Sequence, residues 1–252
     1  MSEDGFGLAV VAIGAALAGF VQGLSGFAFS LVAVGIWAWV LPPSVAAPLT
    51  VFGALVGQVL SMGAVRSGYE TKRIAPFVVA GLLGVPLGAY ILKHSDPTGF
   101  KLIAGSLLMI YGGAVLALRD PPKISAGGAA LDAGAGFLGG ALGGLGGFAG
   151  AAPALWTTLR GWPADVKRAT LQVFNIAMHV WTLTVYAATT GFDPRAVRLA
   201  WVVLPAVLLP GWLGGRLYKR FTEAQYTRFV LMLLVLSGAA LALGALRGLW
   251  GK

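Results

Sequence analysis

Long apolar segments alternate with short basic connections along this chain. A helix that crosses a bilayer needs about 20 apolar residues. Six segments reach or approach this length and are predicted to be transmembrane helices: residues 44–65, 74–92, 102–118, 169–192, 199–215 and 229–246. The pattern predicts an all-α integral membrane protein that passes through the lipid bilayer several times, and we expect it in the cell (inner or plasma) membrane.

Two further apolar regions, 8–41 and 131–159, are each interrupted by glycine. The interruption at 23–26 leaves arms of about 14 and 15 residues, and that at 143–147 leaves arms of about 12 each. Fourteen helical residues rise only about 21 Å, less than the hydrocarbon core of about 30 Å. We therefore expect each region to be a hairpin of two short helices. Their break inside the membrane must be buried or line a wet cavity.

The distribution of Lys and Arg supports the hairpins. If each broken region enters and leaves on one face, six of the 18 Lys and Arg lie on the opposite face from the rest: Lys93, Lys101, Arg195, Arg198, Arg247 and Lys252. If 131–159 crosses once, the bias vanishes. Because Lys and Arg are enriched in cytoplasmic loops, the bias places loops 66–73 and 160–168 in the cytoplasm and both termini outside.

The second half of the chain repeats residues of the first in the same order. Gly19-Phe20 match Gly136-Phe137, Val51-Phe52 match Val173-Phe174, Leu87-Gly88 match Leu213-Gly214, and Lys93 matches Lys219. We expect a first repeat in 1–120 and a second in 121–252, each a hairpin followed by three transmembrane helices. An odd number of crossings per half predicts two inverted-topology repeats, an arrangement in which transporters place the substrate site between the repeats.

Composition narrows the function. Only 11% of the residues are charged, against about 25% in soluble domains. The net charge of +9 comes from basic loops that set orientation, so no nucleic-acid partner is expected. The chain has no Cys and two His, which excludes thiolate catalysis and gives little basis for a metal site. We expect no cofactor, and oligomeric state stays open, including a homo-oligomer.

A few polar residues lie inside the predicted membrane segments. Gln172, Asn175 and His179 are spaced three and four apart, so they share one helix face. Gln58 aligns within one residue of His179 in the repeat. Such groups either join helices by hydrogen bonds or line a pathway, and the one-faced row favours a pathway. His179 is the one of these groups that titrates near neutrality.

The breaks themselves predict an anion site. Short helices that start near 25–26 and 146–147 would present unpaired N–H groups and positive dipole ends, and glycine permits close approach of a ligand. We expect the Ser25 hydroxyl and the amides of Gly26, Phe27, Gly147 and Phe148 to donate to an anion. Close helix packing is the alternative role for the glycines. The aromatic residues near the breaks either shape a pocket or face lipid: Phe27, Phe29, Phe148 and Trp156.

These residues resemble a known family. The segments that carry the resemblance are GFVQGLSGFAFS (19–30), GFLGGALGGLGGFAG (136–150), LLGVPLGAYIL (82–92) and PGWLGGRLY (210–218). Over about residues 8–246 the chain resembles the TauE/SafE family, the toluene sulfonate uptake permease (TSUP) group. The resemblance implies transport of a small organic or inorganic sulfur anion such as sulfite or a sulfonate. The first break reads Leu-Ser-Gly-Phe instead of a Gly-Gly-Gly pattern, so no particular substrate is carried over.

The sequence therefore favours a transporter that holds a small anion between two hairpin tips. The candidate substrate-binding residues are Gln22, Ser25, Gly26, Phe27, Phe29, Gln58, Gly146, Gly147, Phe148, Gln172, Asn175 and His179. An anion channel is one alternative. The other is a rhomboid-like serine protease, because residues 23–26 fit Gly-x-Ser-Gly; Ser25 and His179 would then need hydrogen-bond contact, and a rhomboid has no such internal repeat.

Overall fold

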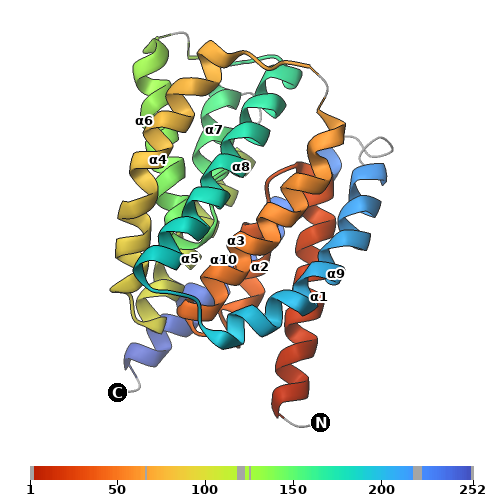
Figure 1. The fold of residues 1–252 in the computed structure, drawn as a ribbon, viewed down its shortest axis with the longest axis vertical. Coiled ribbons are helices and arrows are strands. Elements are labelled where there is room, and N and C mark those ends of the chain that lie inside the picture. The colour runs from red at the N-terminus through yellow and green to blue at the C-terminus, as the bar shows by residue number, and fades with distance from the viewer. Residues whose placement is uncertain (1–2, 66, 118–122, 125, 218–222, 251–252) are drawn as a thin grey trace.

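The computed structural model describes the chain except for residues 1–2, 66, 118–122, 125, 218–222 and 251–252. The described residues form only helices, joined by short connections (Figure 1). The elements are α1 (Glu3–Ser25), α2 (Phe29–Trp37), α3 (Pro43–Ser61), η1 (Met62–Ala64), α4 (Thr71–Lys93), α5 (Pro97–Ala117), α6 (Gly128–Gly146), α7 (Ala151–Leu159), α8 (Ala164–Thr189), α9 (Pro194–Leu217) and α10 (Glu223–Trp250). This confirms the predicted all-α class.

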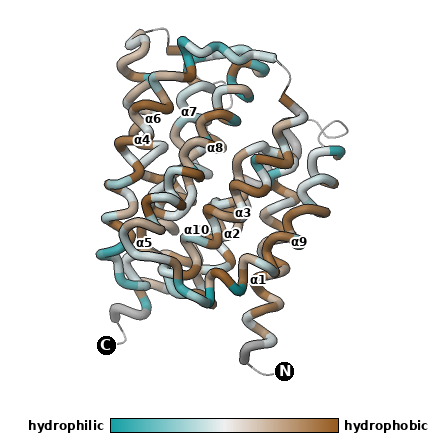
Figure 2. The backbone as a smooth tube through the Cα atoms, in the orientation of Figure 1, coloured by the Kyte–Doolittle hydropathy of each residue, from teal (hydrophilic) through white to brown (hydrophobic). Residues whose placement is uncertain are grey.

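Five described helices are long and apolar enough to cross a membrane: Gly5–Ser25, Pro43–Ser61, Thr71–Lys93, Pro97–Ala117 and Pro194–Leu217. Their outer faces carry large exposed apolar side chains, including Leu83, Trp201 and Leu209. Figure 2 shows hydrophobic residues along α4 and α9 and hydrophilic ones at the connections. A surface of this kind is solvated by lipid, which confirms a multi-pass membrane protein.

Both glycine-interrupted regions form hairpins, but the arms are unequal, which corrects the predicted lengths. In the first, α1 has 23 residues and α2 has 9; in the second, α6 has 19 and α7 has 9. Nine residues rise about 14 Å, half of the hydrocarbon thickness. The long arms run through most of their glycines and end only where Gly26 and Gly147 adopt φ of +84°, a conformation that favours glycine.

The long arms stay helical through their glycines, because neighbouring helices pack directly on these positions. A Cβ on Gly140 would meet the Gly81 backbone of α4, and one on Gly23 would meet the Gly211 carbonyl of α9. The α4–α6 and α9–α1 pairs therefore use the same kind of contact. Close helix packing, one of the two roles left open for these glycines, is thus established for both long arms.

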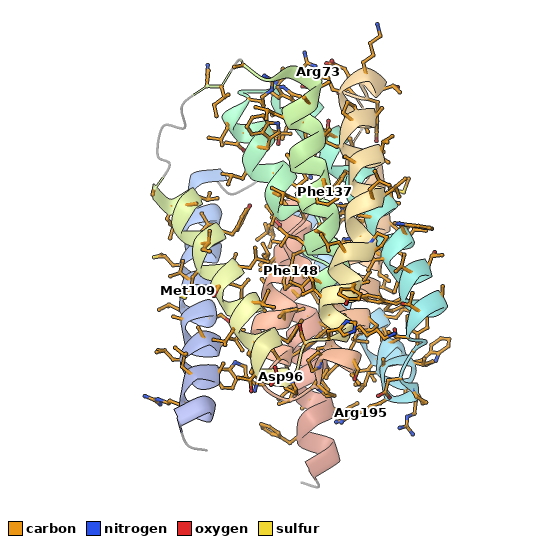
Figure 3. All side chains as sticks on the ribbon, turned by 90° about the vertical axis from the view of Figure 1, so that its left-hand side faces the viewer. Arg73, Asp96, Met109, Phe137, Phe148 and Arg195 are labelled. Carbon is orange, nitrogen blue, oxygen red and sulfur yellow. The ribbon has the colours of Figure 1, made fainter. Side chains whose placement is uncertain are left out.

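The two hairpins open toward opposite ends of the molecule (Figure 1). At the lower end α1 begins, α2 leads into α3, and α10 ends. At the upper end lie the connection from α3 to α4 and the turn between α7 and α8. Figure 3, turned by 90°, likewise places Arg73 at the upper end and Asp96 and Arg195 at the lower end, with Phe148 at mid-height. The hairpin tips therefore lie inside the molecule.

Candidate functional site

The tips of the two hairpins are in contact. A Cβ added to Gly150, just before α7, would lie 3.0 Å from Phe27 Cβ and 3.0 Å from Asn175 Nδ2. A Cβ added to Gly147 would lie 2.8 Å from the Ser30 hydroxyl of α2. The tips meet beside α8, at a point reached by residues of both halves of the chain. We call this point, formed by Phe27, Ser30, Gly147, Gly150 and Asn175, the tip junction.

The first tip is folded by its own side chains. Ser25 Oγ accepts the Ala28 amide at 3.1 Å and the Phe27 amide at 3.4 Å. Gln22 Oε1 accepts the Phe29 amide at 3.2 Å, and the Gly26 amide donates to the Gln22 carbonyl at 2.7 Å. Ser25 and Gln22 therefore shape the turn between α1 and α2, and Ser25 acts as an acceptor there.

The second tip closes α6 with backbone bonds alone. The Gly147 amide donates to the Gly143 carbonyl at 2.7 Å, and the Phe148 amide donates to the Leu142 carbonyl at 3.2 Å. This is the pattern of a glycine-terminated helix C-terminus. Gly26 and Gly147 thus end the long arms instead of starting the short ones. The expectation that the amides of residues 26, 27, 147 and 148 are free donors is not met in this conformation.

Three glutamines connect the first tip to α3 and α8. Gln22 Nε2 donates to the Ala54 carbonyl at 2.9 Å and to Gln58 Oε1 at 3.2 Å. Gln172 Nε2 donates to the Gln58 carbonyl at 2.7 Å. All three side chains are buried. Gln22 and Gln172 thus join helices by hydrogen bonds, and they do so next to the tip junction.

Several buried polar atoms in the described part of the chain have no hydrogen-bond partner. Four belong to predicted site residues or to the tip junction: Ser30 Oγ, Gln58 Nε2, Asn175 Oδ1 and His179 Nδ1. Thr170 Oγ1 and Thr182 Oγ1 of α8 share this property. A buried polar group without a partner costs about 1–3 kcal/mol, so native proteins rarely retain one without a water or ligand to satisfy it. Asn175, His179, Thr170 and Thr182 thus form a row of buried, unpartnered polar groups on α8.

Aromatic side chains of the tips lie inside the protein. Phe29 and Phe148 are buried, which removes lipid exposure as their role. Phe148 Cε2 would lie 3.1 Å from a Cβ on Gly146. Phe27 is partly buried, with its ring edge-on to Tyr111 at 6.2 Å between centroids. The tip junction thus combines neutral polar groups with one aromatic residue, Phe27, and Phe148 directly follows its Gly147.

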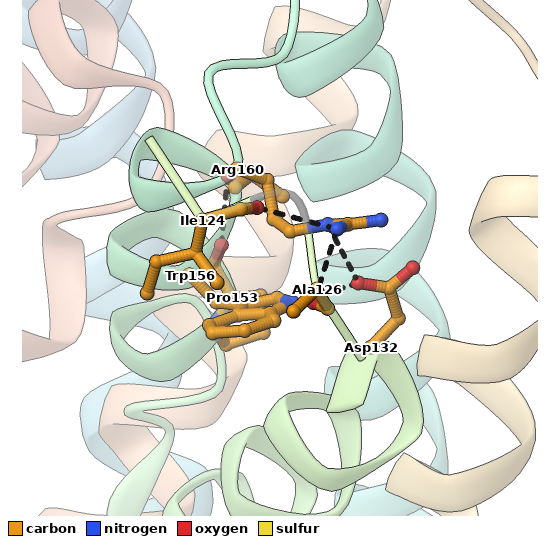
Figure 4. Close-up of polar contacts among 7 residues, drawn as sticks. Ile124, Ala126, Asp132, Pro153, Trp156 and Arg160 are labelled. Carbon is orange, nitrogen blue, oxygen red and sulfur yellow. Dashed lines mark hydrogen bonds and ion pairs between the residues drawn. The ribbon is translucent and has the colours of Figure 1, made fainter. Parts of the chain in front are cut away.

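A buried ion pair at the outer part of the second hairpin escaped the sequence analysis. Trp156 Nε1 donates to Asp132 Oδ1 at 2.7 Å, and Arg160 Nε lies 3.5 Å from the same oxygen (Figure 4). Arg160 Nη1 also donates to the carbonyls of Ile124 and Ala126. These contacts fasten α7 to α6 and to the chain before it. The sequence feature that could have indicated this pair is an acidic residue, Asp132, at the start of an otherwise uncharged segment and an arginine, Arg160, at its end.

This architecture, in which two hairpins with one long and one short arm meet at a buried polar junction among membrane-spanning helices, is typical of helical membrane transporters. The chain matches the family described as "Sulfite exporter TauE/SafE" over residues 11–241, and it belongs to that family. The protein is thus a transporter and not an enzyme. Membership of this transporter family rules out the rhomboid-like protease alternative.

One similar protein is the "Probable sulfite/organosulfonate exporter TauE" of Cupriavidus necator. It is 24% identical to this chain over 235 residues, which cover 90% of each protein. No solved structure matches the chain.

Proposed function

We propose that this protein carries a small sulfur-containing oxoanion, of the sulfite or organosulfonate class, across the cell membrane. The family and the name of the Cupriavidus relative support this substrate class. The observation that carries the proposal is the contact between the two tips, with the unpartnered hydroxyl of Ser30 and the side-chain amide of Asn175 at that contact. A site shared by both hairpins is one that rocking of one half against the other exposes to alternate faces.

Neutral donors suit such an anion. In the described backbone, the amides of Ser30 and Leu31 have no acceptor, as is usual in the first turn of a helix. They lie at the positive end of α2, beside the Ser30 hydroxyl. Gly147 and Gly150 have no side chain, which lets the second tip lie directly against Ser30 and Asn175; even a Cβ there would come within 2.8–3.0 Å of them. We assign the anion to this contact, which widens as the tips separate, with the α2 N-terminus, the Ser30 hydroxyl and Asn175 Nδ2 as donors.

The remaining predicted residues have supporting roles in this proposal. Gln22 and Ser25 hold the shape of the first tip, and Gly26 and Gly147 end the long arms. Gln58 and His179 offer unpartnered polar atoms along the path, and Gln172 fixes α8 to α3. Phe27, Phe29, Gly146 and Phe148 supply the apolar surroundings of the two tips.

We also propose that residues 1–120 and 121–252 are inverted repeats. The two halves have the same order of helices: long, short, then three long. The hairpins open at opposite ends, and α6 packs on α4 as α1 packs on α9. Of the sequence matches, Gly88 and Gly214 both fall on these packing faces, against α6 and α1 respectively; Lys219 lies outside the described residues.

A ligand screen on the purified protein tests the proposal. A ligand that binds only the folded state raises its stability, by about 2.7 kcal/mol at a concentration 100 times Kd. We expect sulfite or a small sulfonate to raise the melting temperature of the wild type and not of the Ser30→Ala/Asn175→Ala variant. Thr184→Ala, an exposed change on α8, is the matched control and should respond like wild type. Equal shifts in all three proteins would place binding elsewhere, and no shift with any sulfur oxoanion would overturn the substrate class.

Counterflow separates a carrier from a channel. In proteoliposomes preloaded with unlabelled anion, a carrier accelerates entry of labelled anion because the loaded site returns faster than the empty one. We expect such acceleration, since the touching tips leave a site that must change its exposure. Entry that never saturates and is insensitive to preloading would favour a channel.

A further inference from the structure

A cavity of about 550 Å³ is lined by residues of both halves of the chain. Its lining comes from the start of α3, the end of α4 with the turn to α5, and the end of α8 with the turn to α9. The ends of α4 and α8 and the starts of α3 and α9 lie at the lower end of the molecule (Figure 1). The tip junction proposed for the anion does not include any of these lining residues. The volume falls within the range of about 300–1,000 Å³ typical of small-molecule sites.

The inner limit of this cavity is a tyrosine. Tyr186 lines the cavity but is only 2% exposed, and it forms a buried cluster with Val51 and Ala89. Its hydroxyl donates to the Gly144 carbonyl at 2.6 Å. Gly144 lies one helical turn before Gly147 of the tip junction.

Val51 completes the connection to the tip junction. Its Cγ2 would lie 3.3 Å from a Cβ on Gly147. Val51 therefore touches Gly147 on one side and belongs to the Tyr186 cluster on the other. Tyr186 and Val51 thus lie between the cavity and Gly147 of the second tip.

The electrostatics of the cavity suit an anion. Lys93 contributes a cation to the lining. The lining carboxylate, Asp193, accepts the Arg195 amide at 2.7 Å and so caps α9. The N-terminal ends of α3, α5 and α9 also lie at this cavity, and such ends carry partial positive charge.

We propose that this cavity is the vestibule through which the sulfur oxoanion passes between the tip junction and the lower face, and that Tyr186 is its gate. The inference rests on the proposed function. With its hydroxyl bonded to Gly144, the ring closes the way past Val51. Breaking that bond and turning the ring opens the way. Because Gly144 belongs to the arm that ends at the second tip, a shift of the tip also moves the acceptor that holds the gate.

Thiol labelling tests the gate directly, because the native chain has no Cys. Val51→Cys is introduced into the otherwise wild-type protein and treated, after purification, with the small anionic reagent 2-sulfonatoethyl methanethiosulfonate. Labelling of the Val51→Cys thiol should be slow while the native Tyr186 separates it from the cavity. Tyr186→Ala should speed it more than about tenfold, because a close-packed layer no longer excludes the reagent. Tyr186→Phe keeps the ring but removes the hydroxyl that bonds to Gly144. It should raise the labelling rate about fivefold, which is the factor expected for the loss of one neutral hydrogen bond.

Ser44→Cys is the matched control, because Ser44 is exposed and lines the cavity on the outer side of the gate. Its labelling rate should be the same with the native Tyr186, with Tyr186→Ala and with Tyr186→Phe. Equal labelling rates of Val51→Cys with the native Tyr186 and with Tyr186→Phe would overturn the gate, even if Tyr186→Ala does not fold. No substrate takes part in this assay. A failed gate is therefore distinguishable from a failed substrate assignment.

A second labelling experiment tests whether the vestibule attracts anions. At Ser44→Cys, the rate of the anionic reagent is divided by that of its trimethylammonium counterpart. Lys93→Gln should lower this ratio by about twofold or more, because removal of a nearby cation weakens attraction of an anion. An unchanged ratio would contradict an anion vestibule and leave the gate result unaffected.

Discussion

The side-chain amide of Gln172 donates a hydrogen bond to the backbone carbonyl of Gln58 at 2.7 Å, across 114 positions of sequence. Gln58 lies on α3 and Gln172 on α8, so the bond joins the two halves of the chain. The Gln58 side chain also accepts from Gln22, which in turn accepts the Phe29 amide of the first tip. One chain of hydrogen bonds therefore extends from α8 to the first hairpin tip.

This chain of bonds makes Gln172 important for stability and for activity. We expect Gln172→Leu to lower the free energy of unfolding by about 1–3 kcal/mol, because the buried Gln58 carbonyl loses its side-chain donor. Transport should fall as well, since α8 carries Asn175. Thermal unfolding and anion flux measure the two effects. Thr184→Val, an exposed change on the same helix, is the control, and equal unfolding of both variants would contradict the role of Gln172.

The two tip glycines should differ in what they tolerate. Both have φ of +84°, but a Cβ on Gly26 meets nothing within 4 Å, whereas one on Gly147 meets Ser30 Oγ at 2.8 Å. Asn is the side chain that best accepts positive φ. We expect Gly26→Asn to keep most transport and Gly147→Asn to lose it.

Valine at either tip glycine should abolish transport, because a β-branched residue does not fit positive φ. Flux is measured at matched expression. Equal transport by Gly147→Asn and Gly26→Asn would contradict the role proposed for the close contact between Gly147 and Ser30.

The Asp132–Arg160 pair should be a strong local determinant of stability. Its side chains are 6% and 15% exposed, and removal of one partner from a buried pair costs about 3–5 kcal/mol. Arg160→Met should destabilise the protein by this amount, and Asp132→Asn in the same chain should restore part of it. Glu70→Gln breaks the exposed pair with Arg73 and should cost less than about 1 kcal/mol. Equal melting temperatures for Arg160→Met and Glu70→Gln would refute this.

His179 is expected to act as a neutral hydrogen-bonding group. It is buried on α8, and its Nδ1 has no partner among the described residues. The neutral donors proposed for the anion make a charged histidine unnecessary. We expect flux to stay flat from about pH 5.5 to about pH 8, the range in which an ordinary histidine titrates, and His179→Gln to keep most activity. Acid-stimulated flux that disappears in His179→Gln would instead indicate proton coupling.

The membrane orientation is testable with single cysteines. The excess of Lys and Arg predicts that loop 66–73 is cytoplasmic and that the lower end faces outside. In right-side-out cells, an impermeant maleimide should label Thr190→Cys at the lower end and leave Ser67→Cys unlabelled until the cells are permeabilised. Both positions are exposed. Labelling of Ser67→Cys in intact cells would reverse the orientation.

The sequence by itself determined the membrane class, the two broken hairpins and the position of most helices. Hydrophobic length and local backbone chemistry act within a few residues, so they are readable from the chain. Pro43, Pro97 and Pro194 each begin a helix, because proline fits the first turn. Gly26 and Gly147 end helices by their positive φ.

Only the tertiary structure decided how these elements meet. Glycines 140 and 23 remain helical because α4 and α9 approach them closely, so the arms are longer than glycine content indicated. Hydrogen bonds within each tip occupy the amides that had been expected to bind an anion. The amides of Ser30 and Leu31 are left without an acceptor in the described backbone. The Asp132–Arg160 pair and the Tyr186–Gly144 bond join residues 28 and 42 positions apart. Such contacts depend on how helices pack in three dimensions, which no local pattern along the chain encodes.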